Sequence, residues 1–330
     1  MMQVMQYTRL GTSGLKVSRI CLGCMSFGGG EKGGFAWTLG YEDSEPIIKK
    51  AIDLGINFLD TANMYSSGKS EEIVGRAAQG RRNDLVIATK VFNPMGPGPN
   101  DRGLSRRHIR QQIGRSLERL KMKYVDLYQT HRWDYETPIE ETLSALDDLI
   151  HEGTVNYIGA SSMWAWQLAT ALDTSERLGL EKFVSMQDHY NLAYREEERE
   201  MIPLCLSRGV GIISWSPLGR GFLSGRYRRG LKPSGRRYES DKYLKERYFR
   251  PQDFKVLDAL LAVSKEKDVP PVQVALAWLL SKPCVVAPIV GVTKLPQLEE
   301  LVGAVDVKLT HEEIKLLEEP YRPRAVEGHY

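Results

Sequence analysis

The chain has 330 residues, of which 42% are hydrophobic and 26% charged, and both fractions are ordinary for a globular protein. Its formal charge of +3 is too small to predict nucleic acid or a membrane surface as a partner. No apolar run reaches the roughly 18 residues of a membrane-spanning helix, and residues 1–10 lack the apolar core of a signal peptide. We therefore expect a cytoplasmic protein that acts on a small molecule.

Short β-branched runs alternate with stretches of helical periodicity along the chain. Strands are expected at residues 19–22, 56–60, 85–90, 125–131, 155–160, 183–187, 210–215 and 285–289. Helices are expected at 44–54, 71–79, 105–120, 138–152, 164–178, 195–207, 271–281 and 295–302. This alternation predicts a parallel sheet, and eight repeats are the number that closes a barrel. We predict an α/β fold, a (β/α)8 TIM barrel formed as a single domain by residues 1–330, with an N-terminal β-hairpin at residues 7–17 that plugs its lower end.

Cys21 and Cys24 have the C-x-x-C spacing that occurs in redox and zinc sites. No second pair and no histidine cluster follows them, and the glycine-rich sequel does not open a helix as a thioredoxin motif would. Four cysteines are also too few for a disulfide framework in a chain of this length. We favour packing as the role of these cysteines, with redox chemistry as the alternative, and we recognise no ligand set for a metal.

Residues 219–250, which follow the seventh strand, form a long basic insert with eleven Lys or Arg against three Asp or Glu. The C-terminal ends of barrel strands face the active site, and phosphate sites often lie there. Two interpretations stay open, a solvated surface loop or a loop beside an anionic ligand, and a nucleic-acid role is disfavoured. Gly219 and Gly221 begin a dinucleotide glycine fingerprint, but Ser224 stands where its third glycine belongs.

Four polar residues stand at or just after the C-terminal ends of neighbouring strands: Asp60, Tyr65, Lys90 and His131. A buried lysine is destabilising unless an acid partners it, so we expect Asp60 to pair with Lys90. A single strand-end lysine or histidine is more often structural. Four complementary groups on adjacent strands instead favour a catalytic site.

The run from Phe58 to Glu72, which reads FLDTANMYSSGKSEE, resembles the signature of the aldo-keto reductase family. Lys90 and His131 stand where that family keeps its other catalytic groups, and the resemblance covers nearly the whole chain. The chain is therefore identified as a member of this family, of a bacterial or archaeal type.

The resemblance implies NADPH-dependent, reversible reduction of aldehydes or ketones to alcohols. Tyr65 would give its phenolic proton to the carbonyl oxygen, and the charge of Lys90 would lower the pKa of that phenol. Asp60 would hold Lys90 in place. His131 would orient the carbonyl and stabilise the developing oxyanion.

The resemblance also implies a binding site for NADP(H). Trp215 would stack on the nicotinamide ring, with a buried core indole as the alternative. Lys294, at the start of the last helix, would bind a 2′-phosphate, unless it is only a solvated helix-end charge. Ser162 and Leu301 each stand where the family often has asparagine. The expected cofactor contacts are Gly23, Cys24, Met25, Asp60, Ser161, Ser162, Gln187, Trp215, Ser216, Pro217, Leu218, Gly219, Arg220, Gly221, Gly291, Thr293, Lys294, Gln297 and Glu300.

The expected substrate contacts at the same mouth are mostly aromatic: Phe27, Trp37, Tyr65, Phe92, His131 and Trp133. The basic insert leaves a phosphorylated or carboxylated substrate open. For His189 we favour a structural role over that of a base, because His131 already fills the catalytic position. The main alternative function is that of an NADP-binding regulatory subunit resembling potassium-channel β-subunits, which turnover would distinguish. A sugar-phosphate lyase or isomerase on the same barrel would not explain these motifs together.

Overall fold

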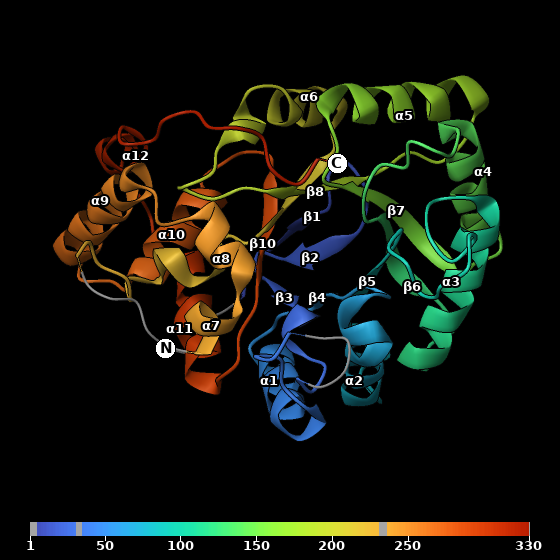
Figure 1. Cartoon of the computed structure of the whole chain (residues 1–330), viewed down its shortest axis with the longest axis horizontal. Coiled ribbons are helices and arrows are strands. Elements are labelled where there is room, and N and C mark those ends of the chain that lie inside the picture. Colours follow the sequence, from blue (N-terminus) through green and yellow to red (C-terminus); the bar gives the residue numbers. More distant parts are fainter. Residues whose placement is uncertain (1–4, 31–34, 231–235, 330) are drawn as a thin grey trace.

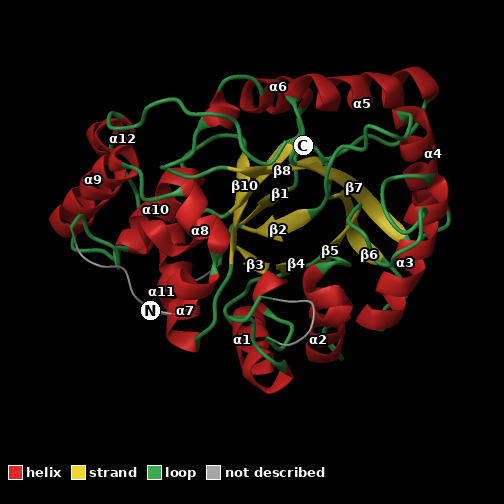
Figure 2. Cartoon of the chain, in the orientation of Figure 1, coloured by secondary structure: helices red, strands yellow, loops and turns green. Residues whose placement is uncertain are grey.

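A computed structural model describes residues 5–30, 35–230 and 236–329 of the chain. In it, eight parallel strands close into a barrel in the order β10-β3-β4-β5-β6-β7-β8-β9 (Figures 1 and 2). Their bounds are β3 Cys21–Gly23, β4 Phe58–Asp60, β5 Val86–Val91, β6 Val125–Thr130, β7 Val155–Ser161, β8 Ser185–His189, β9 Gly211–Trp215 and β10 Val285–Val290. The predicted barrel is therefore confirmed.

Successive side chains of each strand point to opposite faces, which creates two separate cores. Phe58, Leu127 and Ile213 belong to a cluster inside the barrel, whereas Leu59 and Ile212 join the larger cluster between the strands and the helices. Because both faces of the strands are apolar and buried, polar side chains gather where the strands end.

The predicted N-terminal hairpin is formed by β1 (Tyr7–Arg9) and β2 (Lys16–Ser18), which pair in antiparallel fashion. Leu10 and Val17 belong to the core cluster inside the barrel. The turn contacts the backbone at the beginnings of β8 and β9, where a Cβ on Gly11 would lie 2.5 Å from the carbonyl oxygen of Val184. Only glycine fits so close an approach, at a φ of +59°. The hairpin thus closes the lower end of the barrel.

Helices surround the barrel (Figure 2). Those close to the predicted ranges are α1 Tyr41–Asp53, α2 Lys69–Ala77, α3 Arg106–Leu120, α4 Ile139–His151, α5 Ala165–Leu178, α6 Met201–Arg208, α10 Pro271–Leu280 and α11 Leu295–Val302. No helix in the described ranges is both long and apolar enough to cross a membrane.

Two parts of the helical layer differ from the sequence prediction. The helix expected at 195–207 is divided into a 3-10 turn, Glu196–Glu198, and α6, because Pro203 cannot continue a helix that began several residues earlier. Four further helices were not predicted: α7 Arg236–Ser240 and α8 Lys242–Arg247 within the basic insert, α9 Pro251–Lys267, and α12 His311–Glu318.

The C-terminal tail, residues 319–329, returns from α12 across the barrel to a position beside β8 (red in Figure 1). The backbone N–H of Arg324 donates to the Glu196 carboxylate over 2.7 Å, and that of Glu327 donates to the Tyr194 hydroxyl over 2.8 Å. These bonds attach the tail to the segment that follows β8.

Candidate active site

The four predicted catalytic residues lie together at the C-terminal ends of β4, β5 and β6. The Nζ of Lys90 is 2.5 Å from Asp60 Oδ2, 2.9 Å from the carbonyl oxygen of Thr61 and 3.3 Å from the hydroxyl of Tyr65. The ring of Tyr65 packs edge-on against that of His131, with centroids 5.8 Å apart. Because Lys90 is fully buried, its charge depends on these oxygen partners.

The second carboxylate oxygen of Asp60 also accepts two hydrogen bonds. Gln129 and Gln187 donate to Asp60 Oδ1 over 3.0 and 2.9 Å. The hydroxyl of Ser161 donates to the carbonyl oxygen of Gln187 over 2.9 Å. The carboxylate is therefore fixed by donors from three strands, β5, β6 and β8, which sets the position of Lys90 in turn.

Burial decides the protonation of the tyrosine. It raises the pKa of Tyr65 above the ordinary value of 10.0, and the charge of Lys90 lowers it by less than burial raises it. Lys90 thus acts in the predicted direction, but the sequence did not reveal that burial has the larger effect and makes the net shift upward. Burial also disfavours a charged Lys90, but Asp60 and Tyr65 outweigh it and raise the pKa of the ammonium. A protonated phenol thus lies beside a permanent cation.

His131 is held as a neutral ring. Burial, with the charges of Lys90 and Arg132, lowers its pKa well below 6.5. The side-chain nitrogen of Asn93 lies 3.1 Å from Nδ1 of His131. If Nδ1 accepts this bond, Nε2 carries the proton of the neutral ring and can donate it.

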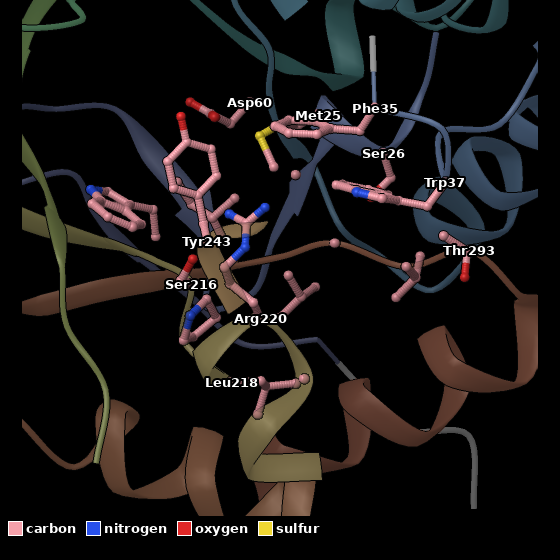
Figure 3. Close-up of a pocket in the computed structure, with 18 of the residues that line it drawn as sticks. Met25, Ser26, Phe35, Trp37, Asp60, Ser216, Leu218, Arg220, Tyr243 and Thr293 are labelled. Atoms are coloured by element: carbon pink, nitrogen blue, oxygen red, sulfur yellow. The ribbon is translucent and has the colours of Figure 1, made fainter. Parts of the chain in front are cut away.

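A cavity of about 970 Å³ begins at this cluster and extends toward the start of α11. In Figure 3, Asp60 lies at the upper left of the labelled side chains and Thr293 at the right, and the side chain of Arg220 projects upward from below. Most expected cofactor contacts line the cavity: Gly23, Met25, Asp60, Ser161, Gln187, Trp215, Ser216, Pro217, Leu218, Arg220, Gly221, Gly291, Thr293, Lys294, Gln297 and Glu300. Of the expected substrate contacts, Trp37, Tyr65, Phe92 and His131 line it as well.

Three expected cofactor contacts lie outside the cavity lining. Cys24 is fully buried, and its thiol is directed to the carbonyl oxygen of Leu22, 3.6 Å away. The hydroxyl of Ser162 accepts from the Trp215 indole instead, over 3.0 Å. Gly219 turns the backbone at a φ of +56° against the ring of Tyr248.

Two expected substrate contacts also lie outside the cavity lining. Phe27 is fully buried in the core between the barrel and its helices. Trp133 is partly buried and packs against Trp166, with ring centroids 6.0 Å apart. The position of a residue just beyond a strand end does not by itself decide which way its side chain points, and both side chains turn to other apolar partners.

The indole of Trp215 is partly buried and lies at the cavity wall. One face lies against the ring of His189, with centroids 4.2 Å apart, while the indole borders the cavity. His189 is itself buried between Trp215 and Tyr194, and its Nε2 lies 2.8 Å from the hydroxyl of Tyr248. Because His189 is absent from the cavity lining, its position fits the structural role that we favoured.

The basic insert borders the cavity. Arg220 pairs with Asp241 over 2.7 Å, and its Nη2 is buried with no hydrogen-bond partner among the described residues. Other lining residues from the insert are Arg226, Tyr227, Tyr238, Tyr243 and Arg247. This location supports the second interpretation, that of a loop beside an anionic ligand.

Sequence reasoning missed several lining residues. Asn93 and Arg132 directly follow predicted site residues, so strand position could have identified them. Phe35 and Tyr243 could not be predicted, because they belong to segments without a periodic pattern. Residues 31–34, in the segment between β3 and α1, lie outside the described residues.

Cys21 and Cys24 are free, buried thiols. Burial and the nearby charge of Asp60 raise the pKa of both thiols. Because the thiolate is the reactive form, this environment fits packing better than redox chemistry.

Comparison with known proteins agrees with this geometry. Residues 19–322 match the aldo/keto reductase family. The chain is 44% identical to versiconal hemiacetal acetate reductase of Aspergillus parasiticus, with 98% of each chain covered. It is 40% identical to aldo-keto reductase dtxS3 of Metarhizium robertsii, covering 98% of this chain and 93% of the relative.

A third relative belongs to a different functional class. The chain is 39% identical to a protein of Arabidopsis thaliana with the name "Probable voltage-gated potassium channel subunit beta", with 92% of each chain covered. These relatives are fungal and plant proteins, so they do not support the expected bacterial or archaeal type. The extent of the family match and the reductase relatives show that the chain belongs to the aldo/keto reductase family, whose members are oxidoreductases that generally use nicotinamide cofactors.

Proposed function

We propose that this protein reduces aldehydes and ketones to alcohols with NADPH, in a reversible reaction in which Tyr65 is the general acid. One observation carries the proposal: the hydroxyl of Tyr65 lies at the cavity within 3.3 Å of a lysine that is itself held by an aspartate. The NADP dependence and the role of Tyr65 are the parts that need experiment.

The residues present fit a dinucleotide phosphate. The cavity joins the catalytic cluster to the start of α11, where Thr293 and exposed Lys294 stand at the positive end of the helix dipole. Between these ends, Arg220 has a buried Nη2 group without a hydrogen-bond partner among the described residues, as a phosphate-binding arginine would. Trp215 lines the same cavity, with His189 stacked on its ring and the Arg247 guanidinium 5.3 Å from the ring centroid, and would contact the flat nicotinamide ring. When bound, the nicotinamide would supply or accept the hydride.

The chain's own residues would donate the proton and stabilise the negative charges that develop during reduction. Burial keeps Tyr65 protonated, so its hydroxyl can donate to a carbonyl oxygen at neutral pH. As that proton leaves, the ammonium of Lys90 lowers the free energy of the phenolate, because opposite charges attract strongly in a buried site. Neutral His131 would donate a second hydrogen bond to the same oxygen and stabilise its developing negative charge.

Two features of the cavity support selectivity, one for the cofactor and one for the carbonyl substrate. Lys294 supplies a cation for a 2′-phosphate, although a lysine lacks the bidentate geometry of an arginine, so the preference for NADPH over NADH should be moderate. Trp37 and Phe92 give the cavity aromatic walls. These walls suit carbonyl compounds with apolar or aromatic substituents.

The test is NADPH oxidation with 4-nitrobenzaldehyde, compared between the natural protein, Tyr65→Phe and Tyr135→Phe. Tyr135 is 64% exposed and serves as the matched control. We expect turnover that falls by about 10²–10⁴-fold in Tyr65→Phe, the usual contribution of a general acid, and is unchanged in Tyr135→Phe. Equal turnover in the two variants would refute the role of Tyr65.

The relative named as a potassium channel subunit favours a second candidate, an NADP-binding regulatory subunit. Tight NADPH binding without turnover of any of several aldehydes and ketones would support it. Failure to bind either nucleotide would contradict both candidates.

A further inference from the structure

Three ionisable side chains far apart in the sequence meet outside the cofactor cavity. Asp188 comes from β8, Glu197 from the 3-10 turn before α6, and His329 from the end of the C-terminal tail. One ligand atom from each lies within 4.8 Å of those of the other two. Glu197 Oε1 and His329 Nε2 are 3.5 Å apart. None of the three residues lines the cavity.

The cluster is buried, and four of its polar atoms have no hydrogen-bond partner among the described residues. Asp188 is 0% exposed, and neither of its carboxylate oxygens has a hydrogen-bond partner among the described residues. The same holds for Oε1 of Glu197 and Nδ1 of His329, whose side chains are 3% and 5% exposed. Buried carboxylates almost always have partners, so atoms without them indicate a bound water or ion.

We propose that Asp188, Glu197 and His329 bind one divalent transition metal ion, of the type of Zn²⁺ or Mn²⁺. Two carboxylates neutralise its charge, and a mixed nitrogen and oxygen set suits these ions. Zinc ligands of this kind lie about 2.0–2.2 Å from the metal, so two of them are roughly 3.4 Å apart in a tetrahedral site. Glu197 Oε1 and His329 Nε2 already have this spacing at 3.5 Å. The limit of 4.8 Å for the whole cluster requires side-chain shifts of about 1 Å to reach tetrahedral spacing.

The ion would fasten the C-terminal tail beside the cofactor cavity. The neighbouring Gly328 lies against Trp215, so close that a Cβ at Gly328 would meet the indole at 3.5 Å. The imidazole of His329 also packs on Trp164, with ring centroids 4.9 Å apart. A metal at this position is structural: it holds the tail where the tail supports Trp215, which borders the cavity.

The experiment uses the full chain after treatment with a chelator. Binding of Zn²⁺ and of Mn²⁺ is measured by titration calorimetry, and that of Co²⁺ by its visible absorption, for the natural protein, His329→Ala and Glu197→Gln. His311→Ala and Glu200→Gln are matched controls, because both residues are exposed. Circular dichroism checks that each variant folds; His329 comes from the chain end, so its loss should leave the barrel intact.

The expected result is one equivalent of metal in the natural protein and in both controls. Binding should weaken by more than about tenfold in His329→Ala and Glu197→Gln, since even residues beyond the ligand shell change affinity by roughly 10–100-fold. Absence of binding in the natural protein would overturn the proposal and mean that the cluster shares a proton instead. Binding that survives in both His329→Ala and Glu197→Gln would overturn it too, because the ion would then lie elsewhere.

Discussion

The imidazole of His189 lies almost parallel to the indole of Trp215, with an interplanar angle of 11° and ring centroids 4.2 Å apart. Tyr194 covers the opposite face of the same imidazole at 3.9 Å. Burial and several nearby arginines, Arg247 first among them, lower the pKa of His189 well below 6.5, so the stack contains a neutral ring. A rigid stack of this kind orients Trp215 at the wall of the cavity.

The stack predicts that His189→Leu weakens NADPH binding more than it slows turnover. An aromatic pair contributes about 0.5–1.5 kcal/mol beyond its buried area, so the Kd for NADPH should rise about 2–10-fold. Quenching of tryptophan fluorescence by NADPH measures this Kd, with the exposed His311→Leu as the control. An unchanged Kd together with a large fall in kcat would contradict a positioning role and point to a catalytic one.

The ion pair of Asp60 and Lys90 predicts a stability effect that can be separated from catalysis. Asp60→Asn leaves the buried ammonium without its anion, and breaking such a pair costs about 3–5 kcal/mol. The double variant Asp60→Asn with Lys90→Met should recover part of this loss, because no buried charge remains. It should stay inactive, since Tyr65 would lack its cation. Urea unfolding and NADPH oxidation measure the two effects, and a double variant that regains activity would refute the role of Lys90.

The pKa shifts predict the pH dependence of reduction. The active form of Tyr65 is protonated and its pKa is raised above 10.0, so kcat/KM should stay level through neutral pH and fall only above pH 10. The pKa of His131 lies well below 6.5, so no step should appear near pH 6.5. Steady-state rates across this range, corrected for acid and alkaline inactivation, provide the check. A fall in kcat/KM centred near neutral pH would show that another group donates the proton, or that a bound cofactor changes the pKa of Tyr65.

The same histidine shift also predicts how stability depends on pH. A histidine with a depressed pKa in the fold is neutral there but takes up a proton when unfolded, so folding loses stability as pH falls below about 6.5. His131 and His189 both have depressed pKa values, so these two residues should each contribute a decrease in the free energy of unfolding on acidification from neutral pH. His131→Gln should show a shallower decrease in urea unfolding at pH 7 and pH 5. Parallel pH profiles for the two proteins would be evidence against this assignment.

Lys294 predicts the cofactor preference. Replacing it with alanine should raise the KM for NADPH by roughly tenfold, the value of one hydrogen bond to a charged group. The KM for NADH, which lacks the 2′-phosphate, should change little. Exposed Lys308→Ala is the matched control. Equal effects on both cofactors would mean that Lys294 binds something other than the 2′-phosphate.

Local patterns were sufficient for the barrel and for most of its mouth. Strand and helix periodicities are properties of neighbouring residues, and in a parallel barrel the position of a residue at a strand end already decides which face it reaches. Asp60, Lys90 and His131 were placed in this way. The direction of a side chain beyond a strand end is not local information, which is why Phe27 and Trp133 turned out to lie outside the cavity lining.

The sequence by itself therefore determined the order of strands and helices and the set of chemical groups at the barrel mouth. Only the tertiary structure decided that burial outweighs Lys90 in setting the pKa of Tyr65, because desolvation depends on everything packed around the phenol. It alone also brought Glu197 beside His329, and the insert's Arg247 and Tyr243 to the cavity. These contacts join residues far apart in the chain, and no periodic pattern in the sequence encodes them.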